Sequence, residues 1–249
     1  MMDQSLRDTR IDLACALRWA VRYGLHEGVD NHFSMAVPDA DGVVRGDRFL
    51  INPHGWHWSE VTATSLVLCD ANGQVLEGDN TVEDTAFYIH SRIHLGVPSA
   101  TVVLHTHMPH ATALTCLAKG RLKMCEQNAL MFHERIAYDD EYNGLALDSE
   151  EGDRLVAALG NRNIMFMAGH GVLVTGPTVA DAFNDLYYLE RAAMFQVLAR
   201  STGGSLRDID DNTVKRTGEQ MATELPKVAD RHFLALRRML DHQEPEYQT

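Results

Sequence analysis

Three histidines follow or join segments that the sequence predicts to be strands, and imidazole nitrogens are common ligands of divalent metals. His105 and His107 are separated by one residue and directly follow an apolar stretch, residues 101–104. In an extended chain, residues i and i+2 point to the same side about 7 Å apart, so both imidazoles can bind one ion. His170 lies between two glycines, where the backbone can turn tightly. Either motif alone is more typical of incidental histidines, but the three together favour a metal site with an open coordination position.

Short strands and helices alternate around these histidines. Apolar and alternating runs predict strands at residues 33–37, 48–51, 65–69, 74–76, 101–104, 164–167 and 172–174. Apolar residues at helical spacing predict helices at about residues 13–21, 82–95, 109–117, 127–133, 150–159, 178–199 and 211–239. Turn residues between several strands favour a mainly antiparallel sheet with helices on its faces. No Pro/Gly/Ser-rich linker is present, so we expect one domain over residues 1–249, with a helical C-terminal extension at about 205–249 that frays from Gln243.

The composition excludes several classes of partner. With 22 basic and 35 acidic residues, the formal net charge of −13 argues against binding to nucleic acid or to an anionic membrane. The apolar runs are too short to span a bilayer, and the N-terminus shows no secretory signal. The four cysteines form no CxxC pair, which is typical of free thiols in a reducing compartment. We therefore expect a cytoplasmic protein that acts on a small molecule.

The segments around the histidines resemble the class II aldolase/adducin head family. The resemblance rests on residues 105–114 (HTHMPHATAL), on residues 169–176 (GHGVLVTG) and on the loop at 25–34, and it covers about residues 8–200. It implies an α/β fold of three layers, α/β/α. It also implies a divalent metal on His105, His107 and His170, with zinc as the first choice and manganese, cobalt or iron as alternatives. The family further implies a homotetramer with sites near the subunit interfaces.

The chain departs from the sugar-phosphate aldolases at the acid/base position. Those enzymes carry a glutamate four residues before a histidine that matches His90, and here that position is Ala86. Glu83 lies one turn earlier on the same predicted helix and is our candidate catalytic residue, because residues i and i+3 share a helix face. The alternative is that Glu83 only complements the helix dipole. Thr81 and Asp84 look like a capping box for this helix.

The loops that bind phosphate in the family also differ. Residues 31–34 (NHFS) replace Gly-Asn-x-Ser, and residues 52–55 (NPHG) replace Thr-Pro-x-Gly. Each change adds an imidazole, which suits a carboxylate or a phenolic oxygen better than a phosphate. We expect the substrate to be bound by Asn31, His32, Ser34, His54 and Gly55. Trp56 and Trp58 are either an aromatic wall for a flat substrate or core residues, and residues 139–141 (DDE) are expected to form a solvated acidic turn.

These features predict a divalent-metal-dependent carbon–carbon lyase, an aldolase or a decarboxylase, that acts on a small hydroxy- or oxo-carboxylate. The metal would stabilise the enolate or carbanion that forms when the bond breaks. Decarboxylation needs no base to remove a hydroxyl proton, so it tolerates Ala86 better than aldol cleavage does. Two alternatives stay open: a non-haem iron oxygenase on the same three histidines, and a non-catalytic interaction module like adducin.

Overall fold

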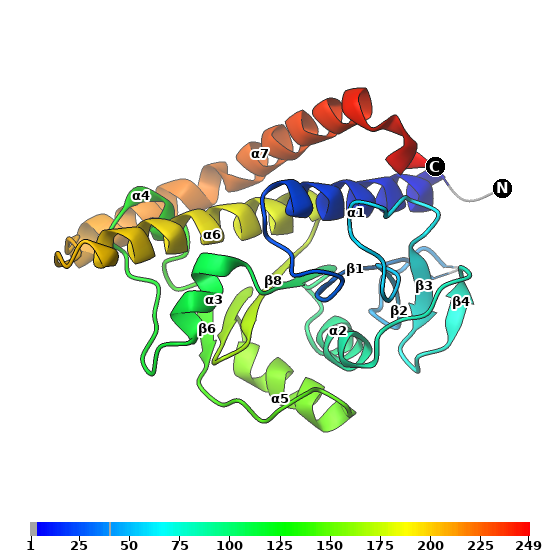
Figure 1. Ribbon diagram of the computed structural model, residues 1–249, viewed down its shortest axis with the longest axis horizontal. Helices are drawn as coiled ribbons and strands as arrows, with labels where there is room; N and C mark the ends of the chain where they lie inside the picture. Colours follow the sequence, from blue (N-terminus) through cyan, green and yellow to red (C-terminus); the bar gives the residue numbers. More distant parts are fainter. Residues whose placement is uncertain (1–3, 40) are drawn as a thin grey trace.

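An eight-stranded sheet forms the centre of the protein, which the computed structural model describes over residues 4–39 and 41–249 (Figure 1). The strand order is β4-β3-β2-β1-β5-β8-β7-β6, and every neighbouring pair is antiparallel except β6 and β7. The strands are β1 (His32–Ala36), β2 (Arg48–Ile51), β3 (Val67–Asp70), β4 (Val75–Glu77), β5 (Val102–Thr106), β6 (Ile136–Asp139), β7 (Ile164–Met167) and β8 (Gly171–Gly176). The predicted, mainly antiparallel sheet is thus confirmed. The sequence did not predict β6, a short edge strand that pairs in parallel with β7.

Helices cover both faces of this sheet and make the three layers that the resemblance implied (Figure 1). The long helices α1, α6 and α7 lie on one face, and α2 and α5 lie on the other. The helices are α1 (Gln4–Arg22), α2 (Asp84–Gly96), α3 (Pro109–Thr115), α4 (Gln127–Leu130), α5 (Ser149–Leu159), α6 (Val179–Ser201) and α7 (Asp211–Gln243). Among the described residues, no helix is both long and apolar enough to cross a bilayer.

Strand alternation divides the core and decides which side chains meet at the site. In β5, Val102 and Leu104 belong to the core under α1 and α6, whereas Val103 belongs to the smaller core with α2 and α5. His105 follows Val103 by two residues and therefore lies on the α2 and α5 face of the sheet. His32 pairs directly with His105 across the β1–β5 ladder, so it lies on the same face.

The C-terminus packs against the core and does not fray, contrary to our expectation. After α7 a short 3₁₀ helix, Pro245–Gln248, buries the side chain of Tyr247 completely. The backbone N–H of Ala63 donates to the carbonyl of Tyr247 at 2.9 Å, and that of Thr64 donates to the carbonyl of Thr249 at 2.8 Å. The buried ring of Tyr247 and two backbone hydrogen bonds to residues 63–64 hold this terminus in place. Its polar sequence had suggested a loose end.

Candidate metal centre

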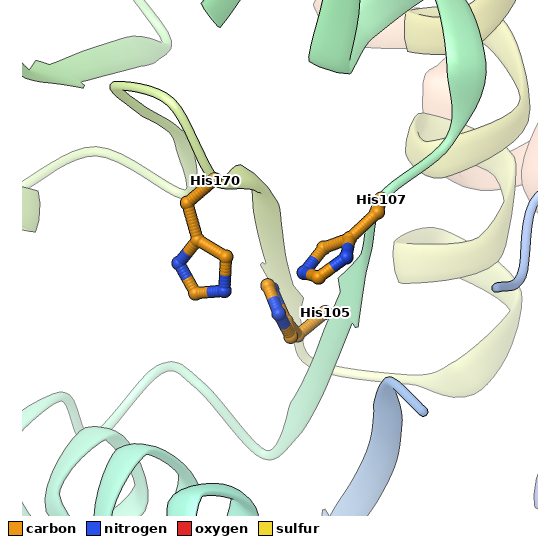
Figure 2. A group of neighbouring side chains, drawn as sticks. All are labelled: His105, His107 and His170. Atoms are coloured by element: carbon orange, nitrogen blue, oxygen red, sulfur yellow. The ribbon is translucent and has the colours of Figure 1, made fainter. Parts of the chain in front are cut away.

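The end of one strand and one turn bring the three predicted ligands together. His105 lies at the end of β5, His107 follows that strand, and His170 lies in the turn from β7 to β8. The β5–β8 ladder brings this turn beside the end of β5. The three ring centroids are 4.8 to 5.1 Å apart, and each residue offers a ligand nitrogen within 4.8 Å of the others. Figure 2 shows the three rings facing one another.

The hydrogen bonds of His105 and His107 leave one nitrogen of each ring free for a metal. Nδ1 of His105 lies 3.0 Å from the carbonyl oxygen of Val172, which can only accept, so Nδ1 carries the proton. Nδ1 of His107 is hydrogen-bonded to the carboxylate of Glu27. Nε2 of His107 is buried and has no hydrogen-bond partner in the described part of the chain. Such partners commonly orient histidine ligands, and a buried bare nitrogen needs a ligand, so the donor set fits a divalent ion.

The environment keeps the imidazoles of His105 and His170 neutral, which is the form that binds metal. Burial holds the pKa of His105 well below its ordinary value, and the neighbouring His170 and His107 lower it further. Burial also lowers the pKa of His170 to about 4, again with a contribution from His107. Near neutral pH, both rings therefore offer a lone pair.

A cavity of about 690 Å³ opens over the three histidines. Of the residues predicted to bind substrate, Asn31, His32 and His54 line this cavity, whereas Ser34 and Gly55 do not. Asn31 is buried, and its side-chain oxygen accepts a hydrogen bond from the backbone N–H of His107 at 3.2 Å. Asn31 thus helps to position His107, a predicted metal ligand, and also forms part of the cavity wall.

Ser34 is fully buried between two histidines of α2. Nδ1 of His94 lies 2.8 Å from the carbonyl oxygen of Ala100, so Nε2 of His94 is the acceptor. The Ser34 hydroxyl therefore donates to His94 at 2.7 Å and accepts from Nδ1 of His90 at 2.6 Å. This arrangement leaves both rings neutral and ties α2 to β1. Here His90 has a structural part, as a partner of Ser34.

We expect this buried pair to make the stability of the protein fall in mild acid. Burial lowers the pKa of His94 to about 4, while an unfolded chain binds the proton below about pH 6.5. The stability that neutral His94 contributes is therefore present above about pH 6.5 and is lost as the pH falls towards 4. The limiting slope is about 1.4 kcal/mol per pH unit for one such group.

The measurement is urea unfolding with a chelator at pH 7, 6 and 5, on the wild type and on His94→Gln. The glutamine can still accept from Ser34 and donate to Ala100, but it does not titrate. The variant should lose less stability over this range, and equal slopes in the two proteins would contradict the expectation.

Glu83 caps α2 and also faces the cavity. Its carboxylate accepts from the backbone N–H of Ala86 at 2.7 Å and from the hydroxyl of Thr85 at 2.5 Å, and it lies 3.4 Å from Nε2 of His32. The predicted capping box of Thr81 and Asp84 is wrong, since Glu83 is the N-cap. Burial by itself would raise the pKa of Glu83, but hydrogen bonds from His32, Thr85 and the backbone lower it to about 2. Glu83 is therefore an anion near neutral pH.

A group of charged residues on the opposite side of the cavity was missed. Asp139 ends β6 with a buried side chain, so the expectation of a solvated turn is wrong at this residue. The guanidinium of Arg154 donates to both oxygens of Asp139, at 2.8 and 2.7 Å, and to both oxygens of Glu151, at 2.8 and 2.7 Å. A polar residue directly after a short apolar run, as at His105, is the signal that could have indicated a strand end at Asp139.

Trp56 and Trp58 do not form an aromatic wall of the cavity. Trp58 is fully buried in the core under α1, against the ring of Phe33 at a centroid distance of 4.7 Å. Trp56 is partly exposed and does not line the cavity. The aromatic ring that does line it is Tyr142, whose centroid lies 6.4 Å from that of His170.

Comparisons with known proteins agree with this architecture. Residues 11–197 match the family described as Class II Aldolase and Adducin N-terminal domain. The crystal structure of an aldolase II superfamily protein from Pseudomonas syringae covers 100% of this chain and 98% of its own, with a TM-score of 0.91 and 31% identity. L-fuculose 1-phosphate aldolase from Glaciozyma antarctica shares the fold over 98% of this chain and 93% of its own, with a TM-score of 0.83 and 22% identity. Human beta-adducin is 30% identical to this chain over 94% of the chain's residues. The matched region is 33% of the length of beta-adducin. The chain belongs to the class II aldolase and adducin family.

Proposed function

We propose that this protein is a divalent-metal-dependent carbon–carbon lyase, an aldolase or a decarboxylase, that acts on a small hydroxy- or oxo-carboxylate. The observation that carries the proposal is the convergence of three imidazoles, from His105, His107 and His170, on one open cavity. A metal ion held there supplies an electrophile that stabilises negative charge beside a substrate oxygen. We propose zinc first, with manganese, cobalt and iron as alternatives, because imidazole suits each of them.

The charges around the cavity favour a carboxylate over a phosphate group. Arg154 is the one lysine or arginine that lines the cavity within the described residues, and two carboxylates already neutralise it. The acidic residues that line the cavity are Glu27, Asp30, Glu83, Asp139, Glu141 and Glu151. A doubly charged phosphate would meet net repulsion there, whereas a single carboxylate matches the donors His32 and His54.

His32 and Glu83 together are the groups that we propose to handle the proton. His32 lines the cavity, its ring stacks on His105 at a centroid distance of 5.8 Å, and the carboxylate of Glu83 lies beside its Nε2. When the carbon–carbon bond breaks, the carbon that keeps the electron pair must gain a proton. His32 delivers that proton and recovers one from solvent, while Glu83 stabilises its charged form. This pair would replace the acid/base glutamate that Ala86 excludes.

A Glu83→Gln variant tests this assignment. The amide oxygen of glutamine can still accept the N–H of Ala86, so α2 should keep its cap at a cost of about 1 kcal/mol or less. The charge beside His32 is lost, and kcat should fall by about 100-fold. The matched control is Asp210→Asn, which removes the charge of the α7 N-cap outside the cavity and should leave kcat unchanged. Turnover by Glu83→Gln at the wild-type rate would remove Glu83 from the mechanism.

The function itself is tested on chelator-stripped protein that is reloaded separately with zinc, manganese, cobalt or iron. We would offer a panel of 2-hydroxy and 2-oxo acids and assay released carbon dioxide and aldehydes. The proposal expects one of these products from the reloaded protein and none from the stripped protein. A chain that binds no metal and turns over nothing would instead be an interaction module, a reading that the similarity to beta-adducin supports. Turnover that needs both iron and oxygen would replace the lyase with an oxygenase.

We further propose that the protein assembles as a homotetramer and acts in the cytoplasm. The first part rests on the family, and the second rests on the four cysteines, which are all free thiols.

A further inference from the structure

The lining of the cavity has a polar side and a second side on which apolar residues lie around one ion-paired group. The polar side is carried by β1, by the loop after β2 and by the start of α2, and its residues are Asp30, Asn31, His32, His54, Glu83 and Thr85. The second side is carried by the middle of α2, by α5, by β7 and by the end of β6 with the loop after it, and its apolar residues are Ile89, Tyr142, Leu145, Ala146, Leu155 and Met167. The same elements carry Asp139, Glu141, Asn143, Glu151 and Arg154, of which Arg154 pairs with both Asp139 and Glu151. We call this the apolar side for its six apolar residues. In the sheet, β5 with two of the three histidines lies between β1 and the β8-β7-β6 edge. The metal centre therefore lies between the two sides.

The apolar side has a buried base and an exposed upper part. Ile89, Leu155 and Met167 are almost fully buried and belong to the core between the sheet and α2 and α5. Above them, Tyr142 is 59% exposed and Leu145 is 70% exposed. Two large apolar side chains that face both a cavity and water gain free energy when an apolar ligand covers them.

The backbone around these two residues is free to adjust. Within the described residues, residues 142–145 make no backbone hydrogen bond to another element. The loop is held at its ends instead. Asp139 anchors one end through Arg154, and Asp148 caps α5 at the other. Ala146, which is buried in the same core as Leu155, fixes the base. We call residues 142–145 the flap.

We propose that the site takes hydroxy- or oxo-acids whose far end is apolar, an aliphatic chain or a ring, and that the flap covers this end. The acid group lies on the polar side near His32 and His54, and the apolar end lies on Ile89, Leu155 and Met167. This inference rests on the proposed function and narrows its substrate class. Each methylene that leaves water on this surface should tighten binding about fourfold, the equivalent of about 0.8 kcal/mol.

The test is calorimetric binding of a series of 2-hydroxy acids to the zinc-loaded protein, from glycolate to 2-hydroxybutyrate, 2-hydroxyhexanoate and 2-hydroxyoctanoate. Affinity should rise about fourfold per methylene until the chain passes the flap. Leu145→Asp should flatten this rise. The matched control is Leu147→Asp, because Leu147 is 59% exposed on the same loop but does not line the cavity, and it should keep the rise. Both sites are exposed, so both variants should fold, and circular dichroism checks this.

The outcomes separate the two proposals. Binding that does not depend on chain length, or an equal effect of the two leucine variants, would overturn the apolar-end inference and leave the lyase proposal intact. Failure of every acid in the series to bind the zinc-loaded protein would instead contradict the proposed function, and the inference with it.

Discussion

Replacing His170 with alanine is expected to remove the metal ion and, with it, turnover. His170 supplies one of only three protein nitrogens in the cluster, and it comes from the turn between β7 and β8, separate from the other two. Loss of a residue that merely orients a metal ligand commonly weakens binding 10- to 100-fold, so loss of a ligand should weaken it by more than about 100-fold. Metal analysis after dialysis should find about one ion per chain in the wild type and almost none in the variant.

His133→Ala is the control for this experiment. His133 is half-buried and lies outside the cavity, so its loss should leave the metal content unchanged. A chelator should also lower the melting temperature of the wild type and not that of His170→Ala, because an ion that binds only the folded chain stabilises it. A full metal complement in His170→Ala would show that the histidine cluster is not the metal site.

Replacing Gly171 with alanine is the second change from which we expect a large effect. A Cβ at this position would lie 2.6 Å from the carbonyl oxygen of Thr106 and 2.7 Å from the ring of His107. Both atoms belong to the segment that carries two of the proposed ligands, so the end of β5 or the His107 ring must move. We expect metal affinity to fall about 10- to 100-fold and the free energy of unfolding to fall by about 1–3 kcal/mol.

Gly176→Ala is the control for this experiment, because it crowds the same strand at a position away from the proposed metal site. Gly176 lies at the other end of β8, where a Cβ would contact Ala182 at 3.1 to 3.3 Å and no metal ligand. This variant should lose stability while it keeps its metal affinity, measured by competition with a chromophoric chelator. If both glycine variants bind metal like the wild type, the close approach of β8 to His107 has no part in holding the ligand.

The elements that the sequence predicts well are those whose signal is local. The strand before His105 is an uninterrupted apolar run, and the period of two places His105 and His107 on one side without any knowledge of the fold. The stripe of α6 is similar, since Ala182 and Leu186 fall at helical spacing and are fully buried. The N-cap of α2 was misassigned, because Thr81 is of a residue type that favours the N-cap position, whereas Glu83, the N-cap in the structure, is not.

The contacts that escaped prediction join residues that are distant in sequence. Glu27 is hydrogen-bonded to His107, which lies 80 residues away in the sequence, and Asp139 is hydrogen-bonded to Arg154, which lies 15 residues away. Ser34 looked like a substrate ligand because its neighbours resemble a phosphate loop. It shares a sheet face with His32 but lies two residues further along β1, where His90 and His94 of α2 cover it. A motif read along the chain identifies which residues do chemistry, but the fold decides which of them face the cavity.

The hydrogen-bonded chain from His90 through Ser34 to His94 also has a mechanical consequence. Each proton in it has one position, because the chain ends on a carbonyl that cannot donate. Sliding α2 along β1 by one turn would leave one of these buried groups without a partner, at a cost of about 1–3 kcal/mol. The helix that carries Glu83 is thus locked in register with the sheet, whereas the flap across the cavity is not. We therefore expect the site to select strictly for the acid end of its substrate and to accept variation at the other end.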